Sequence, residues 1–130
     1  MSEKRILMVD DDESFAQAVT ICLKSKGYQV SYARNKVEGR QKIEETVPDL
    51  VILDVMMDKV CDGFDLAREL RGNLKFNKIK ILMFTAIGDE LGFKYSPGAG
   101  DGRWLPVDDY AEKSIDMEAL SAKVKILLER

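Results

Sequence analysis

Hydrophobic residues along this chain form two alternating kinds of segment. Short, mostly apolar runs occupy residues 6–9, 50–53 and 79–84, as expected of strands that are buried on both faces of a sheet. Between them, apolar side chains recur at helical spacing, for example from Phe15 to Leu23. Strands that alternate with helices predict a parallel sheet with right-handed crossovers and helices on both faces. We therefore expect a doubly wound α/β fold.

Turn and capping signals place the remaining elements. Alternating residues at Tyr28–Tyr32, directly after the helix-stopping Gly27, indicate another strand. Asn35 and Glu38 form a capping-box pattern, which predicts a helix that runs towards Pro48. The other expected elements are a helix after Asp62-Gly63, a short strand near residues 109–112 and a last helix over residues 117–127.

The segment from Gly88 to Asp109 interrupts this alternation. It contains the sequence Ser-Pro-Gly-Ala-Gly-Asp-Gly at residues 96–102 and shows no helical period. A crossover helix is expected here, and we predict that a loop-rich region shortens or replaces it. The glycines follow no strand directly and lack the GK[ST] ending of a nucleotide-binding loop, so we do not interpret them as one.

Composition excludes several classes of protein. The 130 residues are 45% hydrophobic and 33% charged, which favours one domain over residues 1–130, and we expect no effector domain after Arg130. A formal net charge of -3 offers no basic field to phosphate backbones, so direct nucleic-acid binding is not expected. The sequence has no histidine, which excludes Ser-His-Asp and Cys-His nucleophile pairs and imidazole metal sites.

The two cysteines and the N-terminus indicate where the protein resides. Cys22 and Cys61 are too few for a disulfide scaffold and lack the CxxC spacing of zinc and thioredoxin sites. The apolar run at residues 6–9 is too short for a signal peptide, and no window is long enough to span a membrane. We therefore expect a cytoplasmic protein that makes no membrane contact.

Polar residues follow the predicted strands at one edge of the sheet. In chain order they are Asp10, Asp11, Asp12, Asp54, Thr85 and Lys113. Parallel strands bring their carboxyl ends to one edge, so the carboxylates should converge in the crevice where the strand order reverses. Two unit charges about 4 Å apart repel by about 4 kcal/mol at an effective dielectric constant near 20, and Mg²⁺ would relieve this repulsion. One carboxylate could then attack a phosphoryl group, with a lysine balancing the added charge.

Each of these residues also has a simpler interpretation when it is taken alone. The acidic run Asp10–Asp12 could cap the first helix, and Asp54 could end a strand at a turn. Thr85 could be a helix cap and Lys113 a solvated charge. Four polar positions at the ends of successive strands are much harder to obtain by chance.

From Lys4 to about Leu128 the chain resembles the receiver domain of two-component response regulators. The matching segments are 6–13 (Ile-Leu-Met-Val-Asp-Asp-Asp-Glu), 50–57 (Leu-Val-Ile-Leu-Asp-Val-Met-Met), 62–64, 83–86 and 109–113. The resemblance implies a flavodoxin-like, five-stranded parallel sheet of order 2-1-3-4-5. It also implies phosphoryl transfer to this chain from a sensor histidine kinase or a phosphotransfer protein.

The resemblance assigns the metal and acceptor residues. Asp54 matches the phosphoacceptor, and Asp10 and Asp11 match the acidic pair that holds Mg²⁺. Asp11 would be a direct ligand, Asp10 would act through water, and the backbone carbonyl of Met56 would supply a further ligand.

The resemblance also assigns the switch residues. Thr85 matches the switch hydroxyl, Lys113 the phosphate-binding lysine and Tyr110 the aromatic switch, while the small Ala86 leaves access to the acyl phosphate. Phosphorylation would then bias two surface conformations, and the output would pass to an unknown downstream protein from a monomer or weak homodimer.

The sequence departs from the family pattern at several positions. Asp58 replaces a proline, and the loop before Gly63 carries one extra residue. Ser114 follows Lys113 where a proline is usual, so we predict a trans peptide bond there, because a cis bond before serine costs about 2.5–4 kcal/mol. Met56 and Ile87 are apolar where the family flanks the hydrolytic water, which predicts slow self-dephosphorylation.

Two other functions remain open from the sequence. The same fold could serve as a phosphorylation-independent interaction module that uses its altered loop. The Asp10-x-Asp12 pattern after a strand also occurs in small Mg²⁺-dependent phosphohydrolases, although this chain is short for the cap that such enzymes often carry.

Overall fold

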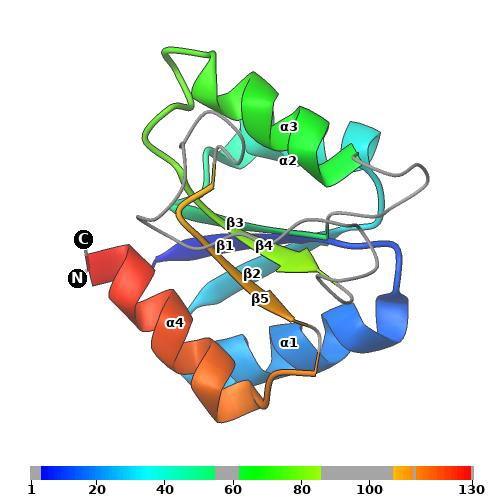
Figure 1. The fold of residues 1–130 in the computed structure, drawn as a ribbon, viewed down its shortest axis with the longest axis vertical. Coiled ribbons are helices and arrows are strands. Elements are labelled where there is room, and N and C mark those ends of the chain that lie inside the picture. Colours follow the sequence, from blue (N-terminus) through cyan, green and yellow to red (C-terminus); the bar gives the residue numbers. More distant parts are fainter. Residues whose placement is uncertain (1–3, 55–61, 86–106, 113, 130) are drawn as a thin grey trace.

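A computed structural model describes residues 4–54, 62–85, 107–112 and 114–129 of the chain. Within them, strands and helices alternate as far as the fourth strand, and a fifth strand and a last helix follow (Figure 1). The elements are β1 (Arg5–Val9), α1 (Glu13–Ser25), β2 (Gln29–Ala33), α2 (Lys36–Thr46), β3 (Leu50–Asp54), α3 (Asp62–Arg71), β4 (Lys80–Thr85), β5 (Asp109–Glu112) and α4 (Met117–Glu129). No helix among the described residues is long and apolar enough to cross a bilayer.

The strands form one parallel sheet in the order β2-β1-β3-β4-β5. The order reverses between β1 and β3, where Leu7 lies opposite Val51 and Val51 in turn lies opposite Ile81. Helices α1 and α4 cover one face of the sheet, and α2 and α3 cover the other (Figure 1). This arrangement confirms the predicted doubly wound, flavodoxin-like fold and its strand order.

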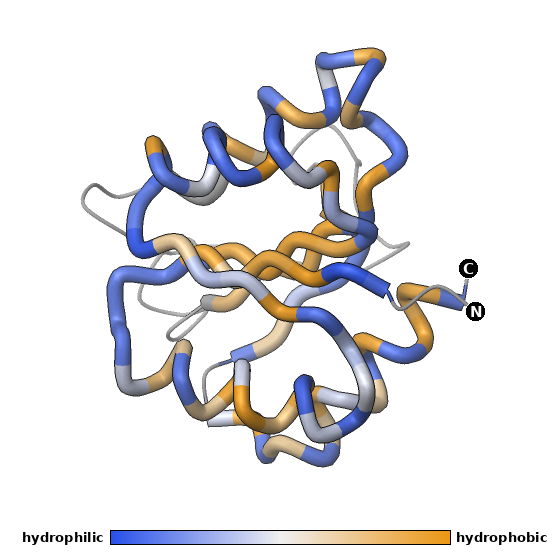
Figure 2. Tube along the Cα trace, turned by 180° about the vertical axis from the view of Figure 1, so that it is seen from behind, coloured by the Kyte–Doolittle hydropathy of each residue, from blue (hydrophilic) through white to orange (hydrophobic). Residues whose placement is uncertain are grey.

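Alternating strand residues supply two separate hydrophobic clusters. Leu7 and Val9 of β1 pack towards α2 and α3, whereas Ile6 and Met8 pack towards α1 and α4. All five residues of β3 are buried. Figure 2 shows the consequence, a hydrophobic sheet between helices that alternate hydrophobic and hydrophilic residues along their length. A strand buried on both faces is apolar at nearly every position, with Asp54 the exception in β3, which is why continuous apolar runs identified the central strands.

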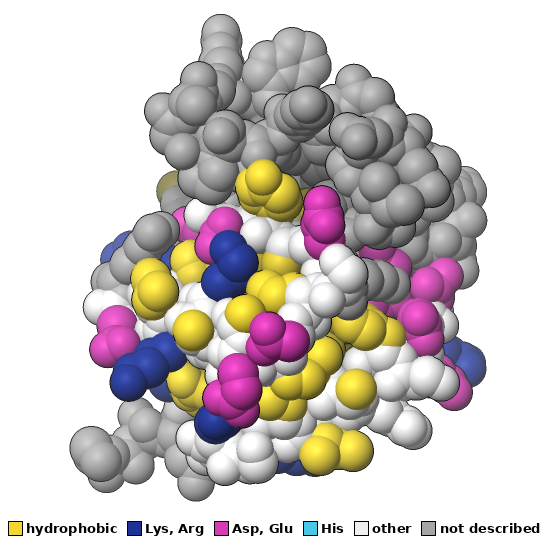
Figure 3. Space-filling model, turned by 60° about the horizontal axis from the view of Figure 1, so that its bottom comes forward, with side chains coloured by type: hydrophobic (Ala, Val, Ile, Leu, Met, Phe, Trp, Pro, Cys, Tyr) yellow, Lys and Arg dark blue, Asp and Glu magenta, His cyan; other side chains and the backbone are white. Residues whose placement is uncertain are grey.

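The face formed by α1 and α4 carries hydrophobic side chains interspersed with charged ones (Figure 3). The large exposed members are Ile21 on α1 and Ile126 on α4, which are 69% and 57% exposed. Single exposed hydrophobic residues of this kind are normal on a folded surface and carry no specific implication.

Capping side chains fix the helix ends. Asp12 caps α1 by accepting a hydrogen bond from the Phe15 amide at 3.1 Å, and Gly27, at φ 97°, ends this helix in a Schellman arrangement. Asn35 caps α2 by accepting from the Glu38 amide at 2.8 Å.

The predicted capping box at α2 is only half correct. The Glu38 carboxylate accepts from the Arg34 amide rather than from the amide of Asn35. Its second oxygen also accepts from the Arg34 side chain. This ion pair favours a position of the carboxylate beside Arg34 instead of Asn35.

Two aspartates hydrogen-bond to the backbone of a neighbouring strand at the amino-terminal edge of the sheet. Asp49, which precedes β3, donates its amide to the Arg5 carbonyl and accepts the Arg5 amide on its carboxylate, both at 2.9 Å. Asp108, which precedes β5, makes the same two bonds to Ile81, at 2.9 and 2.7 Å. Asp108 is also ion-paired with Arg71, which donates further to the Ile79 carbonyl at 2.7 Å.

Helix α2 approaches β1 closely at Gly39. A Cβ at this buried position would lie 3.1 Å from both methyl carbons of Val9, which is tighter than ordinary packing. At its other end, α2 finishes at Val47, whose backbone is left-handed at φ 45°. A β-branched residue in this region is strained by about 1–2 kcal/mol.

Some boundaries differ from those expected. Strand β2 begins one residue later than predicted, β4 runs over Lys80–Thr85, and α3 begins at Asp62 itself rather than after Gly63. Of the loop-rich region predicted over residues 88–109, only its last three residues lie within the described part. The Lys113–Ser114 bond involves a residue outside the described part, so its trans geometry stays a prediction.

Candidate functional site

Three aspartates meet at the carboxyl-terminal edge of the sheet. Asp10 and Asp11 directly follow β1, and Asp54 is the last residue of β3, the neighbouring strand. One carboxylate oxygen of each lies within 4.8 Å of the others. Asp10 and Asp54 are buried, at 0% and 3% exposure, while Asp11 is exposed. The predicted convergence of these three carboxylates is therefore observed, although Asp11 and Asp54 lie far apart in the sequence.

The third aspartate of the acidic run has a different role. The Asp12 carboxylate accepts the Phe15 amide and caps α1, while its own amide donates to Oδ1 of Asp10 at 2.9 Å. The helix-cap interpretation of the run is thus correct for Asp12, and the cluster contains Asp10 and Asp11. Because the Asp12 amide holds one oxygen of Asp10, the start of α1 and the buried acid form one connected turn.

Strand β2 supports this turn from the side. The Asp10 amide donates to the Ala33 carbonyl at 3.1 Å, and the Tyr32 hydroxyl donates to the Asp10 carbonyl at 2.7 Å. Burial raises the pKa of the Tyr32 phenol above its ordinary value, and the carboxylates of Glu13, Asp10 and Asp11 raise it further, in that order. The hydroxyl therefore keeps its proton, and with it the ability to donate, at neutral pH.

Sequence reasoning missed Tyr32. A signal was present, because β2 was expected to end near this residue and parallel neighbours place their carboxyl ends at one edge. The contact could be inferred only once the register of β2 on β1 was known, in which Tyr32 lies opposite Met8 and Ala33 lies opposite Val9. That pairing brings the end of β2 beside Asp10.

The donor set suits a hard cation. Two unit charges 4.8 Å apart repel by about 3.5 kcal/mol at an effective dielectric constant near 20, and two of the three carboxylates, Asp10 and Asp54, are withdrawn from water. Carboxylate oxygens are the preferred protein ligands of Mg²⁺ and Ca²⁺, and the described residues of the cluster offer neither sulfur nor imidazole. The residues present therefore fit a metal ion of this class, with the exposed Asp11 on the solvent side.

The other predicted site residues are only partly placed. Thr85 ends β4, and its backbone pairs with Glu112 at the same edge of the sheet. Tyr110, in β5, is partly buried against the cluster that underlies α2 and α3, and it lies opposite Met83. Positions outside the described residues are Met56, Asp58, Ala86, Ile87 and Lys113.

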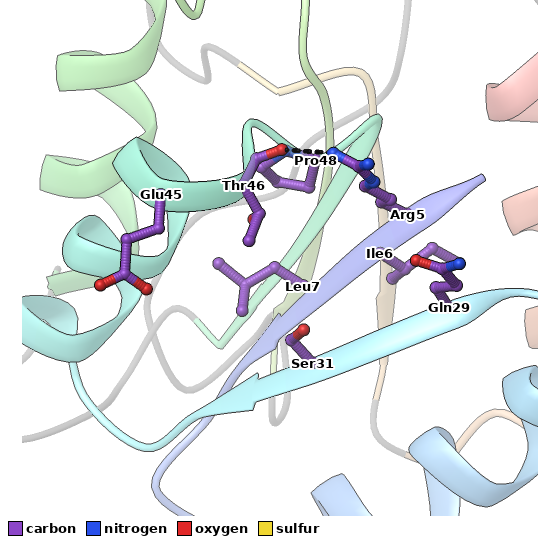
Figure 4. Close-up of a pocket in the computed structure, with 8 residues that line it drawn as sticks. All are labelled: Arg5, Ile6, Leu7, Gln29, Ser31, Glu45, Thr46 and Pro48. Carbon is purple, nitrogen blue, oxygen red and sulfur yellow. Dashed lines mark hydrogen bonds between the residues drawn. The ribbon is translucent and has the colours of Figure 1, made fainter. Parts of the chain in front are cut away.

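A hollow of about 390 Å³ lies away from this cluster. It is lined from the amino-terminal parts of β1 and β2 and from the end of α2, with Leu7 and Ser31 at its floor and Glu45 and Thr46 at its side (Figure 4). Arg5 crosses one end and donates to the Thr46 carbonyl at 3.1 Å. Its lining in the described part of the chain shares no residue with the acidic cluster.

Comparison with known proteins gives one consistent family. A family model described as the response regulator receiver domain matches residues 6–125. The chain is 37% identical over 126 residues to the DNA-binding dual master transcriptional regulator RpaA of Synechocystis sp., a match that covers 97% of this chain and 49% of that protein. It is also 37% identical over 128 residues to the alkaline phosphatase synthesis transcriptional regulatory protein PhoP of Bacillus subtilis, over 98% of this chain and 49% of that one.

Solved structures agree with the sequence matches. The chemotaxis response regulator CheY4 of Vibrio cholerae superposes with a TM-score of 0.81 at 26% identity, over 97% of this chain and 99% of that one. The chain spans about half the length of the curated relatives that it matches and nearly the whole of this structural neighbour.

Proposed function

This chain belongs to the response regulator receiver family, and from that premise we propose that it relays a signal by carrying a phosphoryl group on Asp54. The observation that supports the proposal is the convergence of Asp10, Asp11 and Asp54 within 4.8 Å at the switch point of the sheet. Of the three, Asp54 lies on the central strand β3, next to the strand that ends in Thr85.

In the proposed reaction, an Asp54 carboxylate oxygen attacks the phosphorus of a phosphohistidine on the partner protein. A P–O bond to Asp54 forms as the P–N bond to the imidazole breaks, and the imidazole leaves with the bonding electron pair. The buried position of Asp54 favours this chemistry, because a carboxylate that is partly withdrawn from water is a stronger nucleophile than a fully hydrated one.

We place Mg²⁺ at the acidic cluster, held by Asp10, Asp11 and Asp54 together with the Met56 carbonyl. When bound, Mg²⁺ supplies positive charge that offsets the repulsion between the carboxylates and the phosphoryl oxygens. Asp10 is fixed by the Asp12 amide and by the end of β2, so this side of the site is preorganised.

The remaining assignments follow the resemblance. Thr85 would donate its hydroxyl to a phosphoryl oxygen, Lys113 would balance the added charge, and Tyr110 would change position when Thr85 moves. Slow self-dephosphorylation, predicted from the apolar Met56 and Ile87, also belongs to this proposal. In this scheme the domain assists its own phosphorylation and dephosphorylation but turns over no other substrate.

The partners of the whole protein are part of the proposal. Phosphoryl transfer requires a sensor histidine kinase or a phosphotransfer protein, and a cytoplasmic location is consistent with such a partner. The names of RpaA and PhoP refer to transcriptional regulation, and RpaA is described as DNA-binding, but the chain spans 49% of each. For the 130 residues of this chain, an output through another protein rather than through DNA stays a prediction.

Phosphorylation with a small donor tests the proposal directly. We expect the protein incubated with acetyl phosphate and Mg²⁺ to gain one phosphoryl group by intact-mass spectrometry, and EDTA to prevent the gain. Asp54→Asn should abolish it. Asp12→Asn is the matched control, because asparagine caps a helix as well as aspartate does and Asp12 lies beside the cluster without belonging to it.

Three results would contradict the proposal. A phosphoryl gain that persists in Asp54→Asn would show that another residue accepts the phosphoryl group. No gain in the wild-type protein would favour the phosphorylation-independent interaction module instead. Turnover of a phosphomonoester added in a separate incubation with Mg²⁺ would favour a phosphohydrolase.

A further inference from the structure

We propose that Tyr32 is a positioning residue for the cation pocket, because its hydroxyl fixes the peptide plane that joins Asp10 to Asp11. This inference rests on the proposed cation site and extends it to a residue of β2 that contributes no ligand atom.

Residue 10 is held at three of its polar groups. Its amide donates to the Ala33 carbonyl at 3.1 Å, its carbonyl accepts from Tyr32 at 2.7 Å, and its carboxylate accepts from the Asp12 amide at 2.9 Å. The first two bonds come from consecutive residues at the end of β2. They hold Asp10 after the regular pairing between β1 and β2 has ended at Val9 and Ala33.

The carbonyl that Tyr32 binds belongs to the peptide group between the two cluster aspartates. Rotation of that group would change the direction in which the chain leaves Asp10 and would displace Asp11. Packing constrains Asp11 less than its neighbours, because Asp11 is exposed while Asp10 and Asp54 are buried. The orientation of this peptide plane therefore has a larger effect on Asp11 than on the other two carboxylates.

The tyrosine ring places the hydroxyl where it is needed. Tyr32 lies opposite Met8 in the register and packs, partly buried, against the hydrophobic cluster beneath α1 and α4. The ring thus rests on the core while the hydroxyl reaches the carbonyl beyond the end of β1. Phenylalanine at this position would keep the packing and remove only the donor.

Calorimetric titration with Mg²⁺ tests the proposal on Tyr32→Phe. One neutral hydrogen bond has a net value that corresponds to about a three- to tenfold change in an equilibrium constant, so we expect the Mg²⁺ affinity to fall by about three- to tenfold. The matched control is Tyr28→Phe, which removes the same atom from a tyrosine packed against the same cluster but not bonded to Asp10. Its Mg²⁺ affinity should stay within about twofold of the wild type.

Urea unfolding in EDTA provides the second measurement. If Tyr32 were merely structural, Tyr32→Phe would lower the unfolding free energy and leave the Mg²⁺ affinity of the folded protein unchanged, which would overturn the proposal. An equal loss of affinity in Tyr28→Phe would overturn it as well.

Asp11→Asn separates this inference from the proposed function. Wild-type binding that Asp11→Asn weakens strongly, together with unchanged binding in Tyr32→Phe, would remove the role of Tyr32 and leave the cation site in place. No Mg²⁺ binding in the wild-type protein would remove both.

Discussion

Matched substitutions at Asp49 and Asp108 should have very different effects on stability. Both aspartates precede a strand and make the same pair of bonds to the backbone of the neighbouring strand. They differ in their surroundings, because the bond from Asp49 to Arg5 is exposed, whereas Asp108 is partly buried and ion-paired with Arg71. We therefore compare Asp49→Ala with Asp108→Ala.

The expected magnitudes follow from these contacts. Asp49→Ala removes one exposed hydrogen bond, and water can replace the carboxylate at the Arg5 amide, so we expect a loss of about 1 kcal/mol. Asp108→Ala leaves the amide of the buried Ile81 without its acceptor and removes the ion partner of Arg71. Each loss costs about 1–3 kcal/mol, and allowing for partial hydration we expect about 3 kcal/mol in total.

Equilibrium urea unfolding, followed by far-UV circular dichroism, measures both values. The difference of about 2 kcal/mol corresponds to a separation of about 1 M between the two midpoints if the slope is near 2 kcal/mol/M. Asp108→Asn should fall between the wild type and Asp108→Ala, because the amide oxygen can still accept from Ile81 while the charge is lost. Equal losses for the two alanine variants would refute the reasoning that burial and the arginine set the cost.

Two further substitutions separate local structure from function. Asp12→Ala should lower the free energy of unfolding by about 1 kcal/mol, because α1 loses its cap. The Mg²⁺ affinity should stay within about twofold of the wild type, and a large loss of affinity in calorimetry would show that Asp12 belongs to the metal site. Val47→Asn should raise the unfolding free energy by about 0.5–1 kcal/mol, because asparagine tolerates the left-handed backbone at φ 45°. Val37→Asn, at an exposed position of α2, should not raise the free energy of unfolding. Equal changes in the unfolding free energy of the two variants would contradict the inference that the backbone at Val47 is strained.

The doubly wound fold class and the candidate acids followed from one-dimensional patterns, and the strand order followed from the family resemblance. Runs that are apolar at every position identify strands buried on two faces, as β1 and β3 are. Acids directly after such runs lie at one edge whatever the details of packing, so the meeting of Asp10, Asp11 and Asp54 required only the topology.

Features that depend on register or on competing partners were not predictable in this way. The contact of Tyr32 with Asp10 requires the alignment of β2 on β1, and the two bonds between Asp108 and Ile81 require that β5 begin opposite Leu82. The partner of Glu38 was mispredicted because the Arg34 side chain attracts the carboxylate, an electrostatic preference that the capping-box pattern does not encode. The starts of β2 and β4 were displaced by one residue for a related reason, since backbone pairing with the neighbouring strand decides where a strand begins.

The close contact between Gly39 and Val9 limits how this domain can diverge or be redesigned. Glycine weakens a helix, so drift towards alanine at this position would ordinarily be favoured. Here the added methyl group would press on the residue that immediately precedes Asp10, and a change on α2 would be transmitted to the acidic turn. A designer who grafts a new recognition surface onto α2 can vary its outward-facing positions but should retain the glycine.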